Sequence, residues 1–124
     1  MFKSYSNKGF RITFANGYAL SVQWGPMNYC TNRGTNTNWD IAMSVKDGVY
    51  ESETAEVAVY NPDNKRINLT HNNTVYGNVY ADDIVDLIAL VSEGNESSIE
   101  VYFKRVEFLR SIEDAAYAAY PSED

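Results

Sequence analysis

Hydrophobic and polar residues alternate with a period of two near the start of the chain. Residues 9–14 and 18–24 each place a bulky apolar side chain at every second position, and Asn16-Gly17 lies between the two runs. Alternation of this kind on both sides of a turn sequence is typical of a β-hairpin. The pattern therefore predicts two antiparallel strands joined by a tight turn.

The length of the hairpin loop follows from the face on which the apolar residues fall. A two-residue loop at Asn16-Gly17 would split the apolar residues between two faces, because a shift of one residue reverses every side chain. A three-residue loop over residues 15–17 pairs Phe14 with Tyr18 and puts both apolar sets on one face. Such a loop needs positive φ at its last position, where Gly17 stands. We predict the three-residue loop.

Shorter alternating runs follow and extend the predicted sheet. Turn sequences and short connections separate them, which favours antiparallel pairing. The stretch 25–38 is rich in Asn, Thr and Gly and predicts a long loop at the rim of the sheet. The predicted strands are Trp39–Val45, Ala55–Tyr60, Ile67–Leu69 and Val75–Val79, with a short strand or extended link at Val49–Ser52; the turns are Asp47-Gly48, Asn61–Asn64 and His71–Thr74.

The C-terminal part of the chain changes to helical spacing. Apolar residues at 84, 87, 88 and 91 form one face of a helix that begins at Asp82-Asp83 and ends at Gly94. A second helix is expected after a cap at Ser97 or Ser98; a strand over Ile99–Phe103 followed by a helix is the alternative. The apolar positions of the second helix are Ile99, Tyr102, Phe103, Val106, Leu109, Ile112 and Ala116.

These elements define the expected fold class. A chain of 124 residues can form one domain with its own core, and we assign residues 1–124 to a single domain. Strands followed by helices are typical of α+β folds. We predict an antiparallel twisted sheet of five or six strands with two C-terminal helices packed on one face. Residues 1–8 form a polar lead-in and residues 121–124 a polar tail, and chain ends of this kind often fray.

Charge is unevenly distributed along the chain. The net charge is -7, yet residues 1–39 carry four bases and no acid, so all 17 acids follow residue 39. An acidic surface disfavours nucleic-acid backbones, which need clustered Lys and Arg. It suits a basic protein partner, or it simply aids solubility. We expect no signal peptide, and the sequence holds no apolar run long enough to span a membrane. A single cysteine excludes an internal disulfide, and we expect a cytoplasmic protein.

Residues that commonly carry catalysis are scarce. His71 is the only histidine and stands in a polar turn, and Cys30 is the only cysteine. A nucleophilic cysteine needs a neighbour that lowers its pKa, and Arg33 is the local candidate; a small packing residue is the simpler interpretation of Cys30. One His and one Cys are too few for a typical transition-metal site. We therefore predict no enzymatic activity, no catalytic residue, no metal and no cofactor.

Aromatic and charged residues near the predicted rim loop indicate an interaction surface instead. Tyr, Trp and Arg are common anchors of protein interfaces, although aromatic side chains also fill small cores. A local group of glutamates can meet a basic partner, with a solvated strand edge or a divalent-cation site that includes Asp47 as the alternatives. The predicted partner-binding residues are Trp24, Asn28, Tyr29, Arg33, Glu51, Glu53 and Glu56.

Three segments of the chain resemble a group of small proteins encoded by bacteriophages and other mobile elements. They are FANGYALSVQWGPMNYC (Phe14 to Cys30), YESETAEVAVYNPD (Tyr50 to Asp63) and VYGNVYADDIVDLI (Val75 to Ile88). The first contains the most specific part of the pattern, NGYxxSVQWGxxNYC. The resemblance implies an accessory protein rather than a virion part, and it designates no catalytic residue. By analogy of size, charge and origin it suggests an anti-CRISPR or other anti-defence factor.

The residue pattern and the resemblance together lead to one expected function. We expect a non-enzymatic, phage-encoded inhibitor of a bacterial defence system that occludes a basic, nucleic-acid-binding surface of its target. Its partner is then a host protein or protein–nucleic-acid complex. We expect no direct binding to nucleic acid or to a membrane. The sequence is compatible with either a monomer or a homodimer. The alternative is a binder or sponge of a signalling nucleotide, which needs a pocket lined by aromatic residues and Arg.

Overall fold

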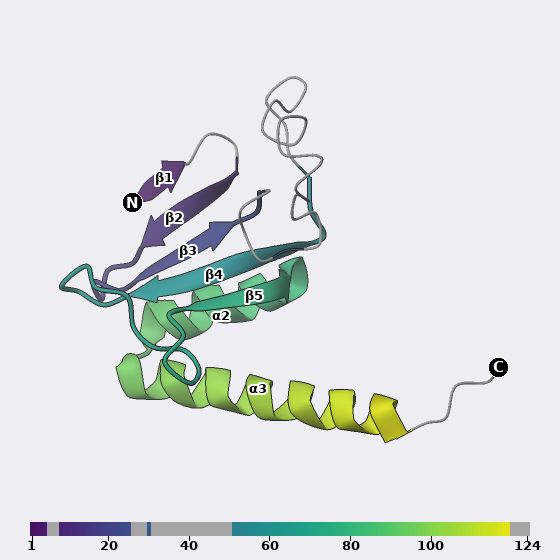
Figure 1. Cartoon of the computed structure of the whole chain (residues 1–124). Coiled ribbons are helices and arrows are strands. Elements are labelled where there is room, and N and C mark those ends of the chain that lie inside the picture. Colours follow the sequence, from purple (N-terminus) through teal and green to yellow (C-terminus); the bar gives the residue numbers. More distant parts are fainter. Residues whose placement is uncertain (5–7, 26–29, 31–50, 120–124) are drawn as a thin grey trace.

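Five antiparallel strands form one sheet, and two helices follow it. The computed structural model of the chain describes residues 1–4, 8–25, 30 and 51–119. Within these residues the strands lie side by side in sequence order (Figure 1). The predicted α+β fold with two C-terminal helices is confirmed. The elements are β1 (Phe2–Ser4), β2 (Gly9–Thr13), β3 (Ala19–Gln23), β4 (Thr54–Tyr60), β5 (Val75–Tyr80), α2 (Ala81–Glu93) and α3 (Glu96–Ala119).

The hairpin of β2 and β3 has the predicted three-residue loop. Phe14 N donates to Tyr18 O at 2.8 Å, and Gly17 N donates to Phe14 O at 3.0 Å. Gly17 has a φ of 88°, which L side chains rarely adopt. A Cβ atom at Gly17 would also lie 3.0 Å from Pro62 Cβ in the β4–β5 connection. Glycine is therefore required here both by the turn and by the neighbouring loop.

Two short segments differ from the sequence-based expectation. Phe2–Ser4 lies in the predicted polar lead-in, yet it forms β1 and pairs with β2, because backbone pairing at a sheet edge needs no apolar run. Ile67 and Leu69 form no strand of their own, although Ile67 N donates to Val59 O at 3.0 Å and both side chains are buried. Their alternation reflects burial rather than a strand. The predicted strand Trp39–Val45, the turn Asp47-Gly48 and most of the loop 25–38 lie outside the described residues.

The core lies between one face of the sheet and the two helices. Alternate sheet residues such as Leu20, Val57 and Val59 are fully buried on this face, and each stabilises the fold by about 1.5–3 kcal/mol relative to an exposed position. Helix α2 contacts β3, β4 and β5, and α3 lies beside α2 on the β5 side (Figure 1). The helices contribute Leu87 and Val91 from α2 and Ile99 and Phe103 from α3.

The tip of the β2–β3 hairpin caps the junction between the helices. Asn16 Nδ2 donates to Val91 O at 2.8 Å and to Gly94 O at 3.3 Å. The carbonyls at the end of a helix have no partner within the helix, so the asparagine satisfies groups that would otherwise stay unpaired. Glu96 N, at the start of α3, donates to Tyr18 Oη at 3.1 Å. One tight turn therefore holds the end of α2 and the beginning of α3.

The start of α3 differs from the predicted one. Asn95 Oδ1 accepts a hydrogen bond from Ser98 N at 3.0 Å, and Asn95 N donates to Ser98 Oγ at 3.0 Å. The predicted cap at Ser97 or Ser98 is wrong, because Asn95 is the cap and Ser98 returns the bond from inside the helix. Gly94 ends α2 as predicted, but its φ is -90°. The close approach explains the glycine, since a Cβ atom there would lie 2.5 Å from Leu90 O.

Helix α3 covers the outer edge of β5. Arg110 Nη1 donates to Gly77 O at 3.2 Å and Nη2 donates to Asn78 O at 3.1 Å, which occupies carbonyls that an edge strand leaves unpaired. The same guanidinium lies 4.4 Å from the centre of the Tyr76 ring. Tyr76 Oη donates to Glu107 Oε2 at 3.2 Å. Burial raises the pKa of Tyr76 to about 12; the Arg110 cation opposes this rise and the Glu107 carboxylate adds to it.

The C-terminal half of α3 extends beyond the sheet (Figure 1). Ile99 and Phe103 are buried as their spacing suggests, whereas Leu109 and Ile112 are 50% and 48% exposed. Ala116 is exposed as well. Helical spacing predicts which residues share a face, but it does not predict where the supporting sheet ends.

Replacing Asn16 by alanine should destabilise the domain. Asn16→Ala removes the donor for two helix-end carbonyls, and leaving a part-buried acceptor unpaired costs about 1–3 kcal/mol. Urea unfolding followed by circular dichroism measures the free energy. Asn68→Ala, at an exposed position of the β4–β5 connection, is the control and should change it by less than about 0.5 kcal/mol. Equal effects of the two substitutions would contradict the capping role.

Folding stability should fall above pH 10 through Tyr76. The unfolded chain releases the phenolic proton near the ordinary pKa of 10.0, whereas the folded protein keeps it to a pKa of about 12. The stabilising contribution is therefore complete below pH 10 and is lost as the pH rises toward 12. Tyr76→Phe should flatten this fall in urea unfolding measured across that range. Tyr102, whose pKa is raised by burial, Asp83 and Asp86, should account for part of the remaining slope; an unchanged slope in Tyr76→Phe would refute the assignment.

Candidate functional site

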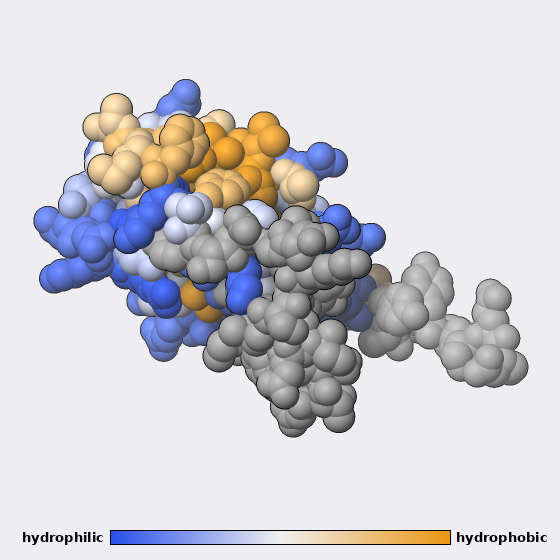
Figure 2. Space-filling model, turned by 90° about the horizontal axis from the view of Figure 1, so that it is seen from above, coloured by the Kyte–Doolittle hydropathy of each residue, from blue (hydrophilic) through white to orange (hydrophobic). Residues whose placement is uncertain are grey.

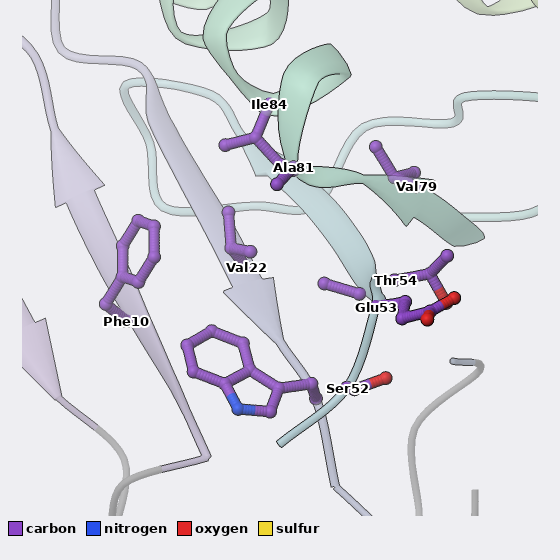
Figure 3. Close-up of a pocket in the computed structure, with 10 residues that line it drawn as sticks. Phe10, Val22, Ser52, Glu53, Thr54, Val79, Ala81 and Ile84 are labelled. Carbon is purple, nitrogen blue, oxygen red and sulfur yellow. The ribbon is translucent and has the colours of Figure 1, made fainter. Parts of the chain in front are cut away.

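A pocket of about 270 Å³ opens between the sheet and the first turn of α2 (Figure 3). Most of its wall is aromatic or aliphatic, and the polar part comes from the segment that leads into β4. The pocket lies on the same face of the sheet as the core. Its lining residues are Phe10, Val22, Trp24, Ser52, Glu53, Thr54, Ala55, Val79, Ala81 and Ile84.

Side chains alternate between the two faces along β2 and β3, and this alternation puts the apolar residues of the pocket wall on one face. Phe10 pairs with Val22 across β2 and β3, and directly opposed residues project to the same face. The rings of Phe10 and Trp24 meet edge to face with their centres 6.3 Å apart, a favourable aromatic geometry. Ala81 and Ile84 close the pocket from above because α2 begins directly after β5 (Figure 3).

One acidic residue borders this apolar pocket. Glu53 lines it and is exposed, whereas Asp82 and Asp83 follow Ala81 in α2 without lining the pocket. Among the described residues that line the pocket, none is Lys, Arg or His. An apolar wall with a negative rim accepts an apolar or cationic group and repels an anion.

The apolar surface continues from the pocket toward β1. Phe2 pairs with Ile12, so its side chain lies on the face that carries Phe10. Met1 and Phe2 are 84% and 81% exposed. Figure 2, the view from above, shows apolar residues gathered in one continuous area. Large exposed apolar areas with polar surroundings are typical of binding surfaces.

The opposite face of the sheet carries positive charge. The Arg11 guanidinium lies 4.0 Å from the centre of the Tyr60 ring and donates to Asn64 Oδ1. Arg66 Nε donates to Tyr60 Oη at 3.0 Å. Both arginines are therefore held around one tyrosine, on the side that the helices do not cover.

The structure unites two of the predicted partner-binding residues and separates others. Trp24 and Glu53 both line the pocket. Glu51 is exposed two residues earlier in the chain. Glu56 pairs with Gln23 and alternates with the core residues Ala55 and Val57, so it lies on the opposite face. The remaining predicted residues, Asn28, Tyr29 and Arg33, lie outside the described residues.

Cys30 and His71 have ordinary structural environments. Cys30 is buried, and its Sγ lies 3.6 Å from Gly25 O, as expected for a packing residue. His71 is exposed in the turn before β5, and it borders a hollow next to Lys104 and Glu107 of α3. In the described part of the chain, no three His, Cys, Asp or Glu side chains are grouped to hold a metal ion.

The sequence analysis missed a second acidic feature, which is the exposed face of α2. This helix carries Asp82, Asp83, Asp86 and Glu93 and no base, and all four acids are exposed. A helical projection would have found the face, because Asp82, Asp86 and Glu93 lie on one side of the helix, opposite the buried Val91. Asp82 and Asp83 therefore do more than mark the start of the helix.

Comparison with known proteins adds no assignment. No protein-family model, no curated protein and no solved structure matches the chain. Among the described residues, none of the helices has the length and apolar character needed to cross a membrane.

The pocket should bind small apolar aromatic compounds and reject anions. Indole should shift the NMR methyl signals of Val22, Ala55 and Ile84, whereas inorganic phosphate and cyclic nucleotides should leave them unchanged. Ala81→Trp should block indole by filling the entrance. Ala89→Trp, at an exposed position on the same helix, is the matched control and should preserve binding. Shifts produced by a cyclic nucleotide instead of indole would contradict this chemistry.

Proposed function

We propose that this protein is a non-enzymatic binding protein that covers a basic, nucleic-acid-binding surface of a bacterial host protein. The proposal rests mainly on the apolar pocket, which has Glu53 at its border. Interfaces commonly combine a buried apolar centre with a polar rim, and a few anchors in the centre supply most of the binding energy. The pocket is suited to one large apolar side chain from the partner.

The exposed acids of α2 favour a partner that normally holds nucleic acid. The four acids between Asp82 and Glu93 give about one negative charge per 5 Å of helix, at about 1.5 Å of rise per residue. One strand of DNA carries about one charge per 3.4 Å. The acidic face therefore offers a charge density of the same order as a phosphate backbone, which a cluster of Lys and Arg would attract.

The separation of charge across the sheet supports a defined orientation. The four acids of α2 lie on the helix side, whereas Arg11 and Arg66 lie on the other face together with Glu56. A basic partner would be attracted toward α2 and the pocket and repelled from the arginine side. The proposal fits a phage-encoded inhibitor of bacterial defence that acts in the host cytoplasm, which the sequence resemblance suggested.

The second candidate function is binding of a signalling nucleotide. A nucleotide site needs donors for its phosphates, whereas the described pocket contributes no Lys or Arg and places Glu53 at its border. The pocket is also slightly smaller than the roughly 300–1,000 Å³ of typical ligand sites. We therefore favour a protein partner over a nucleotide.

Blocking the pocket should prevent capture of the partner. Protein immobilised on resin is mixed with bacterial lysate, and the captured protein is identified and purified. Ala81→Trp should abolish its capture, whereas Asn68→Trp, at an exposed position of the β4–β5 connection, should not. Fluorescence polarisation then measures whether the purified partner releases labelled nucleic acid when this protein is added. A partner that keeps its nucleic acid at saturation, or that binds none, would refute the proposed function.

Charge reversal on α2 should weaken the same complex. Asp86→Lys should lower the affinity about two- to fivefold through an exposed charge contact, and the loss should shrink at high salt. Asp63→Lys, which makes the same charge change in the exposed β4–β5 connection, should have a smaller effect. A complex insensitive to salt and to reversal of Glu51, Glu53 and Asp86 would remove the electrostatic part of the proposal.

A further inference from the structure

Helix α3 presents a second apolar face that points away from the core. Ile99 is buried, whereas Val101, Phe108 and Ile112 are 62%, 63% and 48% exposed. The three exposed positions follow one another at intervals of seven and four residues, which is the spacing of a seam between two helices. Leu109, which is 50% exposed, lies beside them. This face has the pattern of a helix–helix contact.

The charges beside this face indicate its occupant. Arg105, Leu109 and Glu113 follow at intervals of four residues, so they form one row on the helix surface. The row runs from positive through apolar to negative. About 12 Å of helix axis separates the two charged ends, at about 1.5 Å per residue, which is too far for pairing within one helix. When the row is reversed, it is complementary to itself.

We propose that α3 is the interface of a homodimer in which the α3 helices of two copies pack antiparallel. A two-fold axis near Leu109 brings Arg105 of each copy opposite Glu113 of the other. It also brings Phe108 and Ile112 of the two copies together between the helices. A two-fold interface between identical chains requires such a self-complementary surface. Binding to an unrelated partner does not require it.

The same row of charges disfavours the parallel arrangement. Parallel packing would place Arg105 against Arg105 and Glu113 against Glu113 of the second copy, and like charges at these positions are destabilising. The helix is held firmly for either arrangement, because Arg110 binds two carbonyls of β5. Electrostatics therefore selects the antiparallel dimer.

The length of the α3–α3 contact limits the affinity of the dimer. The exposed apolar positions 101–112 cover about three turns of a helix that is 24 residues long. Such a contact lies at the small end of specific interfaces, below about 1,200 Å². We expect a dimer with micromolar affinity that dissociates on dilution.

Light scattering coupled to size-exclusion chromatography tests the dimer on the full chain. From low micromolar to millimolar concentration, the mass should rise from 14.0 kDa toward twice that value. Phe108→Glu should keep the protein monomeric throughout. Val85→Glu makes the same kind of change at a position on α2 that is 67% exposed, and it should dimerise like the unchanged protein. A monomer at all concentrations, or a dimer that Phe108→Glu leaves intact, would overturn the proposal.

Exchanging the charges of Arg105 and Glu113 tests the antiparallel geometry. This test remains valid even if Phe108→Glu disturbs folding. Arg105→Glu and Glu113→Arg should each weaken dimerisation about tenfold, because each places like charges opposite at two sites. A mixture of the two single variants should form a heterodimer, since both contacts are then again between opposite charges. The double variant Arg105→Glu/Glu113→Arg should dimerise like the unchanged protein. Failure of the mixture to associate would overturn the antiparallel arrangement.

Discussion

The side-chain amide of Asn16 joins the sheet to the helices at the point where α2 ends and α3 begins. The other end of α2 needs no such tie, because Ala81 follows the last residue of β5 directly. Helix α2 is therefore fixed at both ends, by a hydrogen bond from the hairpin and by the continuous chain. This constraint sets how much of the sheet the helix covers. The pocket wall formed by Ala81 and Ile84 follows from it, since the first turn of α2 stands over the sheet without a flexible connection.

The elements that the sequence predicted well are those whose pattern has a single geometric solution. Only one register keeps the apolar residues on both sides of Gly17 on one face, and the structure has that register. The first helix likewise buries Leu87 and Val91 as its spacing requires. β1 escaped prediction because three residues at a sheet edge contain no usable period. The cap at Asn95 escaped because three neighbouring polar residues could each serve, and only the geometry of the junction selects one.

The candidate site was harder to predict than the fold for a physical reason. Period-two alternation assigned Phe10 and Val22 to an apolar face, but it cannot show that α2 leaves part of that face uncovered. Trp24 and Glu53 were among the predicted binding residues, and they meet at the pocket because Glu53 lies just before β4. Glu56 was grouped with them by its closeness in sequence. It lies on the other face because alternation within β4 turns it away from the core.

Arg110 has an effect on the sheet that goes beyond holding α3. Its guanidinium binds the backbone carbonyls of Gly77 and Asn78 in β5, so a strand that added at this edge would have to displace the side chain, whereas β1 forms the other edge of the described sheet. Cross-β fibrils need two competent edges on every molecule, because each chain must receive a neighbour above and below. A molecule with one such edge can join a second molecule there, but the pair then offers no site for growth. The arginine thus works against growth of the sheet from β5, and strand addition at β1 alone would stop at a pair of molecules.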